Sequence, residues 1–239
     1  MTARKVHDAA RRVRLVACGA LAALLWMGAA PAVGTPAVVE ASGLGAGRAA
    51  TGFVSNFNLH HNGWTVLSGS WDHPNGAVLH TVGVVGEVAS AARIGRFGDF
   101  TFEARMKRLG CTSCANRLVV RSRVDSAGEL DFAPAFFFQY SNEAPGEEGM
   151  FSVFKVKTDG SSVVVKGWTE TPAVNKGGWN TLKVEAVGST YHFYINGTLV
   201  WEGSRTGLST GRVGISMYTE PFSTGDDFRV DWARLTLAP

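Results

Sequence analysis

The sequence has few cysteines and no recurring pattern of metal ligands. Only three of the 239 residues are cysteines, and the C-x-x-C at 111–114 has no second C-x-x-C or H-x₃-H pair to accompany it. A structural zinc site needs four such ligands at matching spacing. We therefore expect no zinc site in this chain.

The sequence also lacks runs of like charge once its first 34 residues are set aside. The whole chain carries a net charge of +3 from 23 basic and 20 acidic residues. Five of the basic residues but only one acid, Asp8, lie in positions 1–34, so the rest holds 18 basic against 19 acidic residues, a net charge of about −1. This balance offers no attraction to a polyanion, and we expect no nucleic-acid partner.

The first 34 residues have the order of features typical of a secretory signal peptide. A basic segment with Arg4 and Arg14 precedes an apolar run over 15–30, and Ala30-Pro31-Ala32 supplies a small-residue cleavage site. The apolar run is too short and too rich in glycine and alanine for a membrane span. We predict a signal peptide over 1–34, a flexible linker over 35–51 and a secreted protein without a membrane anchor after cleavage.

The two cysteines that remain after cleavage, Cys111 and Cys114, stand between strand-like segments. In an exported protein such a pair is by default a disulfide. A redox C-x-x-C normally opens a helix, and no helical period is found here. We predict a Cys111–Cys114 disulfide that shapes one loop and adds at most about 2 kcal/mol of stability.

Residues 52–239 show no helical period, and turn signals recur every 8–12 residues, which is typical of a β-sandwich. All 14 phenylalanines and six of the seven tryptophans lie in this part, enough for a large aromatic core. About fourteen short strands are expected, more than an immunoglobulin-type domain uses. The pattern predicts strands over 53–57, 64–71, 77–82, 88–94, 99–108, 117–125, 130–140, 150–157, 162–169, 179–187, 190–196, 198–203, 211–218 and 226–237.

The clearest single stretch is WNTLKVEAVGSTYHFYINGTLVWEG, at 179–203. Asn196-Gly197 between two apolar-rich runs is a strong hairpin signal, because both residues tolerate a positive φ. Together with GWTVLSGSWDHPNGAVLHT (63–81) and DFTFEARMK (99–107), it resembles concanavalin A-like lectin/glucanase domains, in particular their laminin-G-like and keto-disaccharide hydrolase-like branches. This resemblance implies an all-β, two-sheet jelly-roll sandwich for residues 52–239. It also implies a function directed at carbohydrate.

A possible catalytic motif occurs at GELDFAP, 128–134. Glucanases with this jelly roll use E-x-D-x-E or E-x-D-x-x-E, in which the two glutamates are the nucleophile and the acid/base. Glu129 and Asp131 match the first two positions and would share one strand face, about 6.6 Å apart. The second glutamate is replaced by Ala133 or Pro134, and retaining hydrolysis needs both carboxyl groups. We therefore predict no catalytic residues.

A carbohydrate-binding face is predicted from polar side chains that alternate with core residues. Arg117, Arg121 and Arg123 alternate along one strand, and in AFFFQY (135–140) Phe137 and Gln139 lie opposite to the other aromatic residues. Arginine and glutamine can form hydrogen bonds with sugar hydroxyls while an aromatic ring stacks on the sugar. The ligand-binding residues predicted on one concave sheet face are Arg105, Arg121, Arg123, Gln139 and Trp168.

No cofactor is required by these patterns, although Asp226 and Asp227 near the C-terminus could lie beside a calcium ion, as in other jelly rolls. The leading hypothesis is a secreted, non-catalytic lectin-like domain that binds a cell-wall or extracellular glycan. One alternative is a saccharide hydrolase of the glucanase or keto-disaccharide hydrolase type. Another is an adhesive protein–protein module with no sugar site.

Overall fold

The computed structural model describes residues 52–58, 60, 63–76, 78–84, 88–123, 132–143, 148–221 and 226–238. All of them belong to one compact unit, Gly47–Pro239. The expected signal peptide and linker lie outside the described residues, as do Glu129 and Asp131. Within the described ranges, no helix has the length and apolarity needed to cross a membrane.

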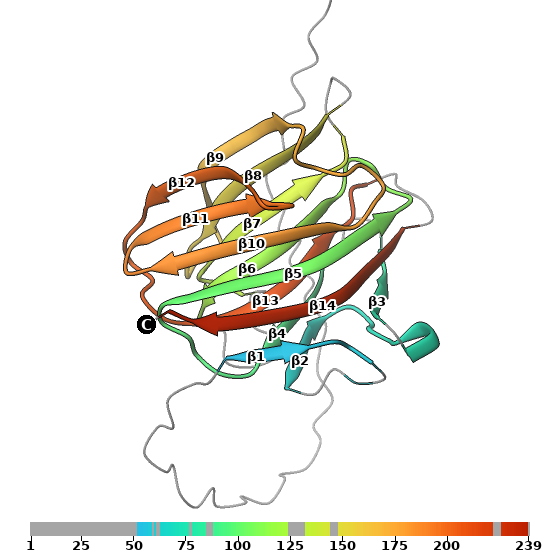
Figure 1. The fold of residues 1–239 in the computed structure, drawn as a ribbon, viewed down its shortest axis with the longest axis horizontal. Helices are drawn as coiled ribbons and strands as arrows, with labels where there is room; N and C mark the ends of the chain where they lie inside the picture. The colour runs from blue at the N-terminus through green and yellow to red at the C-terminus, as the bar shows by residue number, and fades with distance from the viewer. Residues whose placement is uncertain are drawn as a thin grey trace, which may run out of the picture. The chain divides into compact units, whose positions relative to one another are not determined.

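The unit consists of two seven-stranded antiparallel sheets, which confirms the predicted two-sheet jelly-roll sandwich (Figure 1). In sheet A the order is β1-β14-β5-β10-β11-β12, with β3 also paired to β14, and in sheet B it is β2-β4-β13-β6-β7-β8-β9. The strands are β1 (Phe53–Ser55), β2 (Trp64–Ser68), β3 (Leu79–Val82), β4 (Val88–Arg93), β5 (Phe100–Leu109), β6 (Ala115–Ser122), β7 (Ala135–Ser141), β8 (Gly149–Val156), β9 (Ser162–Thr171), β10 (Asn180–Val187), β11 (Thr190–Ile195), β12 (Thr198–Ser204), β13 (Arg212–Tyr218) and β14 (Asp227–Leu237).

The core lies between the two sheets and follows from the alternation of apolar and polar residues. In β5 every second residue from Phe100 to Met106 is fully buried, whereas the intervening side chains are partly exposed. In β7, Phe136 and Phe138 belong to the core cluster, and Phe138 contacts Phe193 of β11 across it, with ring centroids 5.0 Å apart. Successive side chains of a strand point to opposite faces, so each sheet keeps a second, outer face.

Two buried arginines hold the sandwich at opposite ends of β5. At the C-terminal end, Arg108 donates two hydrogen bonds to the carboxylate of Asp226, and both side chains are almost completely buried. Arg108 also donates to the carbonyls of Ala115 and Tyr218, each at 3.0 Å. These bonds connect β5 of sheet A to β6 and β13 of sheet B. At the N-terminal end, the buried arginine is Arg121.

The predicted hairpin over 179–203 is present as β10, β11 and β12. Its Asn196 has φ 50° and Gly197 has φ 84°, which the Asn-Gly pair accommodates. The Asn196 side chain accepts a hydrogen bond from the Thr181 amide at 2.8 Å and donates to the Ala173 carbonyl at 2.8 Å. The turn is therefore fixed by its side chain as well as by its backbone.

The predicted disulfide between Cys111 and Cys114 is confirmed, with the two Cα atoms 5.5 Å apart. It closes the connection between β5 and β6, and both cysteines are buried. The Cys114 sulfur also accepts a hydrogen bond from the Glu220 amide at 3.2 Å. The disulfide thus shapes the loop at the end of β5 where Arg108 is buried.

Candidate functional site

A row of six polar side chains crosses the outer face of sheet B. Direct cross-strand pairing connects each member of this row to the next, from β2 through β4, β13, β6 and β7 to β8. We call these residues the polar row: Ser68, Ser90, Ser216, Arg117, Gln139 and Ser152. Because the side chains of directly paired residues lie about 4.5–5.5 Å apart, the row forms a continuous line of hydrogen-bonding groups.

Arg117 lies near the middle of the polar row and is held in place by its neighbours. Its Nε donates to Gln139 Oε1 at 2.9 Å, and Gln139 Nε2 donates to Ser152 Oγ at 2.6 Å. The guanidinium carbon also lies 5.9 Å from the Phe137 ring centroid and 5.6 Å from that of Phe154. The arginine is therefore positioned both by a hydrogen-bonded relay and by aromatic rings from the same two strands, β7 and β8.

Aromatic side chains lie on both sides of the polar row: Phe137 and Phe154 on one side, and Tyr218, whose cross-strand partner is Ala115, on the other. Phe137 of β7 and Phe154 of β8 are paired directly and stack at 4.7 Å with an interplanar angle of 8°. Tyr218 of β13 lies 5.5 Å from the Arg117 guanidinium. Aromatic rings beside a line of donors and acceptors are the combination that binds a sugar ring by its apolar face and its hydroxyls together.

Most of the polar row is buried. Ser90 and Ser216 are fully buried, and Gln139 and Ser152 are only 6% and 5% exposed. Arg117, Phe154 and Tyr218 remain partly exposed. Among the residues that the structure describes, the Ser216 hydroxyl has no hydrogen-bond partner, which is unusual for a buried polar group. A ligand would meet the partly exposed side chains first and reach Gln139 and Ser152 beneath them.

Trp168 stands at the β9 end of the polar row. The pairing of β8 with β9 shifts between Phe151 and Val153, which leaves Gly167 and Trp168 together opposite Ser152. A second buried cluster, besides the core between the sheets, includes Val119, Phe132 and Phe137. Trp168 is partly exposed and belongs to neither core cluster of the described residues. The structure thus brings together two of the five predicted ligand-binding residues, Gln139 and Trp168.

The other three predicted residues do not share that face, and the expected common surface is wrong in this respect. Arg105 belongs to β5 of sheet A, on the opposite outer face, where it pairs with Asp231 at 2.7 Å. Arg123 follows the end of β6, is exposed, and approaches the Gly207 carbonyl at 3.5 Å. The alternation along a strand predicts which of its residues share a face, but it does not predict which of the two sheets the strand belongs to.

Arg121 is buried inside the end of the sandwich rather than displayed on the face of sheet B. Two residues of β6, Val120 and Arg121, stand opposite one residue of β13, and Arg121 has φ 54°. Such a β-bulge re-aims the side chain. Its Nη1 donates to the carbonyls of Gly188 and Leu208 at 2.6 and 2.9 Å. This arginine therefore connects loops at the end of the sandwich.

The predicted calcium ligands Asp226 and Asp227 have different surroundings. Asp226 is buried and receives hydrogen bonds from Arg108 and from Thr219, the latter at 2.8 Å. Asp227 pairs with Arg229 at 2.6 Å and with His80 at 3.1 Å. Both carboxylates already have cationic partners. Among the residues that the structure describes, no group of three or more His, Cys, Asp and Glu side chains is placed to hold a metal ion.

Asp227 gives the fold a small dependence on pH. Hydrogen bonds from Arg229, together with the charges of Arg229 and His80, lower the pKa of the Asp227 carboxyl. A carboxyl whose pKa is lower in the folded state stabilises the fold at pH values above its unfolded-state pKa of about 3.9. This stability is lost as the pH falls through the folded-state pKa. For this partly exposed pair the gain is at most about 1 kcal/mol.

We therefore expect the Asp227→Asn variant to unfold more easily than the wild type at pH 7 but equally easily near pH 2. Urea unfolding followed by tryptophan fluorescence at a series of pH values measures the difference. A difference that stays constant from pH 7 to pH 2 would contradict this assignment.

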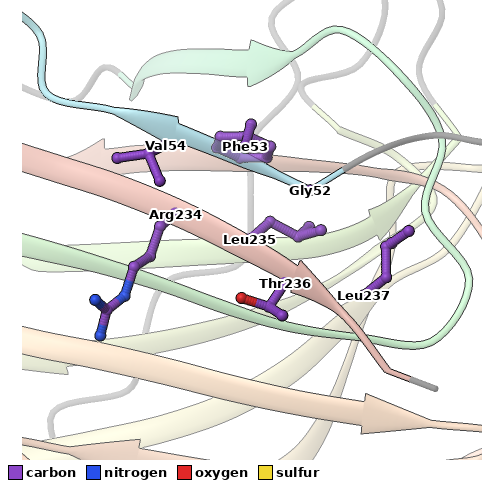
Figure 2. A pocket seen from close by; sticks show the side chains of 7 residues that line it. All are labelled: Gly52, Phe53, Val54, Arg234, Leu235, Thr236 and Leu237. Carbon is purple, nitrogen blue, oxygen red and sulfur yellow. The ribbon is translucent and has the colours of Figure 1, made fainter.

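A shallow hollow on the other side of the molecule lies along β1 and β14 of sheet A (Figure 2). Its exposed side chains are mainly aliphatic, with Val54 70% and Leu237 39% exposed. Arg234 extends away from it, and its Nε donates to Glu103 at 2.7 Å. The hollow offers hydrocarbon but few directed hydrogen-bonding groups, so the polar row is the stronger candidate site.

Sequence reasoning missed Ser90, Ser216 and Ser152 as members of the site. Each is a small residue that stands between two core residues of its strand. This alternation of small polar and apolar residues is visible in the sequence. Arg117 was visible in the same way, as a residue that alternates with Leu118 and Val120. Only the cross-strand register shows that these four side chains stand in one line.

Comparison with known proteins supports the fold. No protein-family model matches the chain, and no curated protein matches it. Among solved structures, similarity extends to the carbohydrate-binding module CBM66 from Bacillus subtilis, with a TM-score of 0.52 and 21% identity over 73% of this chain and 92% of the module. A Bacillus licheniformis beta-glucanase matches with a TM-score of 0.58 and 12% identity over 80% of this chain and all of the glucanase.

A legume lectin-like domain from Entamoeba histolytica matches with a TM-score of 0.55 and 11% identity, over 74% of this chain and 91% of that domain. These matches cover most of the β-sandwich, so the fold that the sequence resemblance implies is confirmed. At such low identities the likeness establishes the fold alone. The neighbours include both sugar-binding proteins and glucanases, and they do not decide between these functions.

Proposed function

We propose that this concanavalin A-like chain is a secreted, non-catalytic protein that binds a cell-wall or extracellular glycan on the outer face of sheet B. The observation that carries the proposal is the polar row beside its aromatic neighbours, with Arg117 held by Gln139 and Ser152. The row supplies several fixed donors and acceptors, and Phe154, Tyr218 and Trp168 supply partly exposed rings. Such an arrangement suits a ligand that has hydroxyl groups on its edge and C–H groups on its face.

Secretion is part of the same proposal. The leader-like features of residues 1–34 favour export. The Cys111–Cys114 disulfide is compatible with an oxidising compartment, where such bonds persist. In such a location the partner would be a glycan outside the cytoplasm.

The non-catalytic assignment rests on the composition of the site. None of the six residues of the polar row is a carboxylic acid, and retaining hydrolysis requires two carboxyl groups beside the scissile bond. The carboxylates that the sequence offers for the hydrolase alternative, Glu129 and Asp131, lie outside the described residues. The likeness to beta-glucanases keeps that alternative as the second candidate.

The test is a glycan array probed with the full chain and with two variants, Gln139→Leu and Trp168→Ala. We expect each variant to weaken binding about tenfold, because Gln139→Leu releases Arg117 and Trp168→Ala removes a ring at the end of the row. Lys176→Ala, in the exposed loop between β9 and β10, is the control and should bind as the wild type. Thermal unfolding confirms that each variant is folded.

Several outcomes would overturn the proposal. Wild-type binding by both site variants would reject the polar row as the site. An array without hits would favour the adhesive protein–protein alternative. Release of reducing ends from a bound glycan, abolished by Glu129→Gln, would favour the hydrolase.

A further inference from the structure

Three of the six described tryptophans do not contribute to the core. Trp64, Trp71 and Trp201 pack into the main core cluster or against it, whereas Trp168, Trp179 and Trp232 belong to neither core cluster. Trp168 stands on the side of the polar row. Trp179, which precedes β10, and Trp232 of β14 both alternate with buried residues of sheet A and are partly exposed. Two large aromatic side chains therefore lie on the outer face of sheet A.

The orientation of Trp179 is fixed by an arginine that is itself fixed by a carboxylate. The guanidinium carbon of Arg105 lies 5.1 Å from the Trp179 ring centroid. Arg105 Nη1 donates to Asp231 Oδ2 at 2.7 Å. The guanidinium contacts the indole by a cation–π interaction, and the ring as a whole stays partly exposed.

The same arrangement occurs a second time at Trp232. The guanidinium carbon of Arg234 lies 5.0 Å from the Trp232 ring centroid, and Arg234 Nε donates to Glu103 Oε1 at 2.7 Å. Trp232 is the direct cross-strand partner of Arg105. The two indole–guanidinium–carboxylate groups thus adjoin one another over three neighbouring strands, β10, β5 and β14.

The spacing of the two indoles suits an extended chain. Trp232 belongs to β14 and Trp179 directly precedes β10, two positions away in the sheet, which separates the two residues by about 10 Å across the strands. An exposed indole that is held in one orientation loses little side-chain entropy when it binds. Two such rings in sequence can stack on two sugar residues of one polysaccharide chain.

The charges of this face point to a neutral ligand. Each carboxylate on the outer face of β10, β5 and β14 has a cationic partner within 3 Å: Glu103 with Arg234, Glu185 with Lys183, Asp227 with Arg229 and Asp231 with Arg105. Lys107 of β5 is the remaining charge on this face, so these three strands carry five basic and four acidic side chains there, a net charge of about +1. So small a net charge gives the face little field with which to attract a polyanion or a polycation.

We propose that the outer face of sheet A is a second glycan-binding surface, specific for neutral polysaccharides, with Trp179 and Trp232 as its stacking residues. It lies on the opposite face of the sandwich from the polar row and does not depend on that row. A chain with both surfaces can bind two polysaccharide strands at once, or bind one polymer at two points. Simultaneous use of two sites raises the overall affinity without any new contact.

The experiment is native gel electrophoresis of the full chain in gels that contain barley β-glucan, xylan or glucomannan. We expect at least one of these neutral polymers to retard the wild type. The Trp179→Ala/Trp232→Ala double variant should need about tenfold more polymer for the same retardation. The Trp179→Phe/Trp232→Phe variant keeps an aromatic face at each position and should retain most of the binding. Thermal unfolding of each variant verifies that it is folded.

The polar row is inactivated separately by Gln139→Leu/Trp168→Ala. If that variant binds as the wild type while the Trp179/Trp232 alanine variant does not, the second surface stands and the proposed function at the polar row fails. A folded Trp179/Trp232 alanine variant that is retarded as strongly as the wild type would overturn the second surface. So would absence of retardation by all three polymers, or a preference for polygalacturonate that salt abolishes.

Discussion

Replacing Asp226 by asparagine is expected to lower the free energy of unfolding by about 3–5 kcal/mol, because it leaves the Arg108 guanidinium buried without a counter-charge. Both side chains are almost completely buried, and Arg108 makes further hydrogen bonds to backbone carbonyls that require its charge and geometry to stay in place. Asparagine has nearly the same shape as aspartate, so the loss reports the charge and not a cavity. Urea unfolding followed by tryptophan fluorescence measures it.

The matched control is Asp231→Asn, which breaks the partly exposed pair with Arg105 on sheet A. Its side chains are 32% and 41% exposed, and we expect a cost below about 1 kcal/mol. A double replacement of the buried pair, Arg108→Met with Asp226→Leu, removes both charges together. It should recover part of the stability that Asp226→Asn loses. A loss below 1 kcal/mol for Asp226→Asn would show that the pair does not hold the two sheets as described.

Arg121→Ala is expected to cost about 3 kcal/mol and to leave the glycan specificity of the folded protein unchanged. The side chain is fully buried and donates to the carbonyls of Gly98, Gly188 and Leu208. Each buried acceptor that loses its donor costs about 1–3 kcal/mol. Asp99, which pairs with Arg121 at 3.1 Å, is 45% exposed and can be hydrated instead. Thermal and urea unfolding measure the stability, and the glycan array measures the specificity.

Arg121→Lys separates charge from geometry at the same position. Lysine keeps the positive charge but lacks the planar fork that reaches several carbonyls at once. It should recover only a small part of the lost stability. If Arg121→Ala instead left the stability unchanged and abolished glycan binding, Arg121 would belong to a ligand site after all, and the structural role argued here would be wrong.

Much of the fold could be predicted because its signals are local. Fourteen strands are expected and the described residues contain fourteen, since each has its own alternation of apolar residues and its own turn residues. The predicted division of the β7 side chains between two faces is also confirmed. Phe136, Phe138 and Tyr140 lie in the core, and Phe137 and Gln139 lie on the outer face. These features depend on neighbours within a few residues.

The composition of the candidate site could be predicted only in part, because it depends on pairing between strands that are distant in sequence. Ser216 and Gln139 flank Arg117 through the register of β13, β6 and β7, which no local pattern specifies. Arg105 was assigned to the wrong surface because alternation does not tell which of two sheets a strand joins. The bulge at Arg121 was missed because it arises from a mismatch between β6 and β13.

The sequence by itself determined the all-β class, the order and number of the strands, the disulfide and which side chains face the core where a strand has no bulge. These follow from turn residues, cysteine spacing and a side-chain period of two. The tertiary structure decided which strands form each sheet, which polar residues stand in one row, and which arginines are buried at the ends of the sandwich. The physical reason is that a one-residue shift or bulge in long-range pairing redirects a side chain, while the local sequence stays the same.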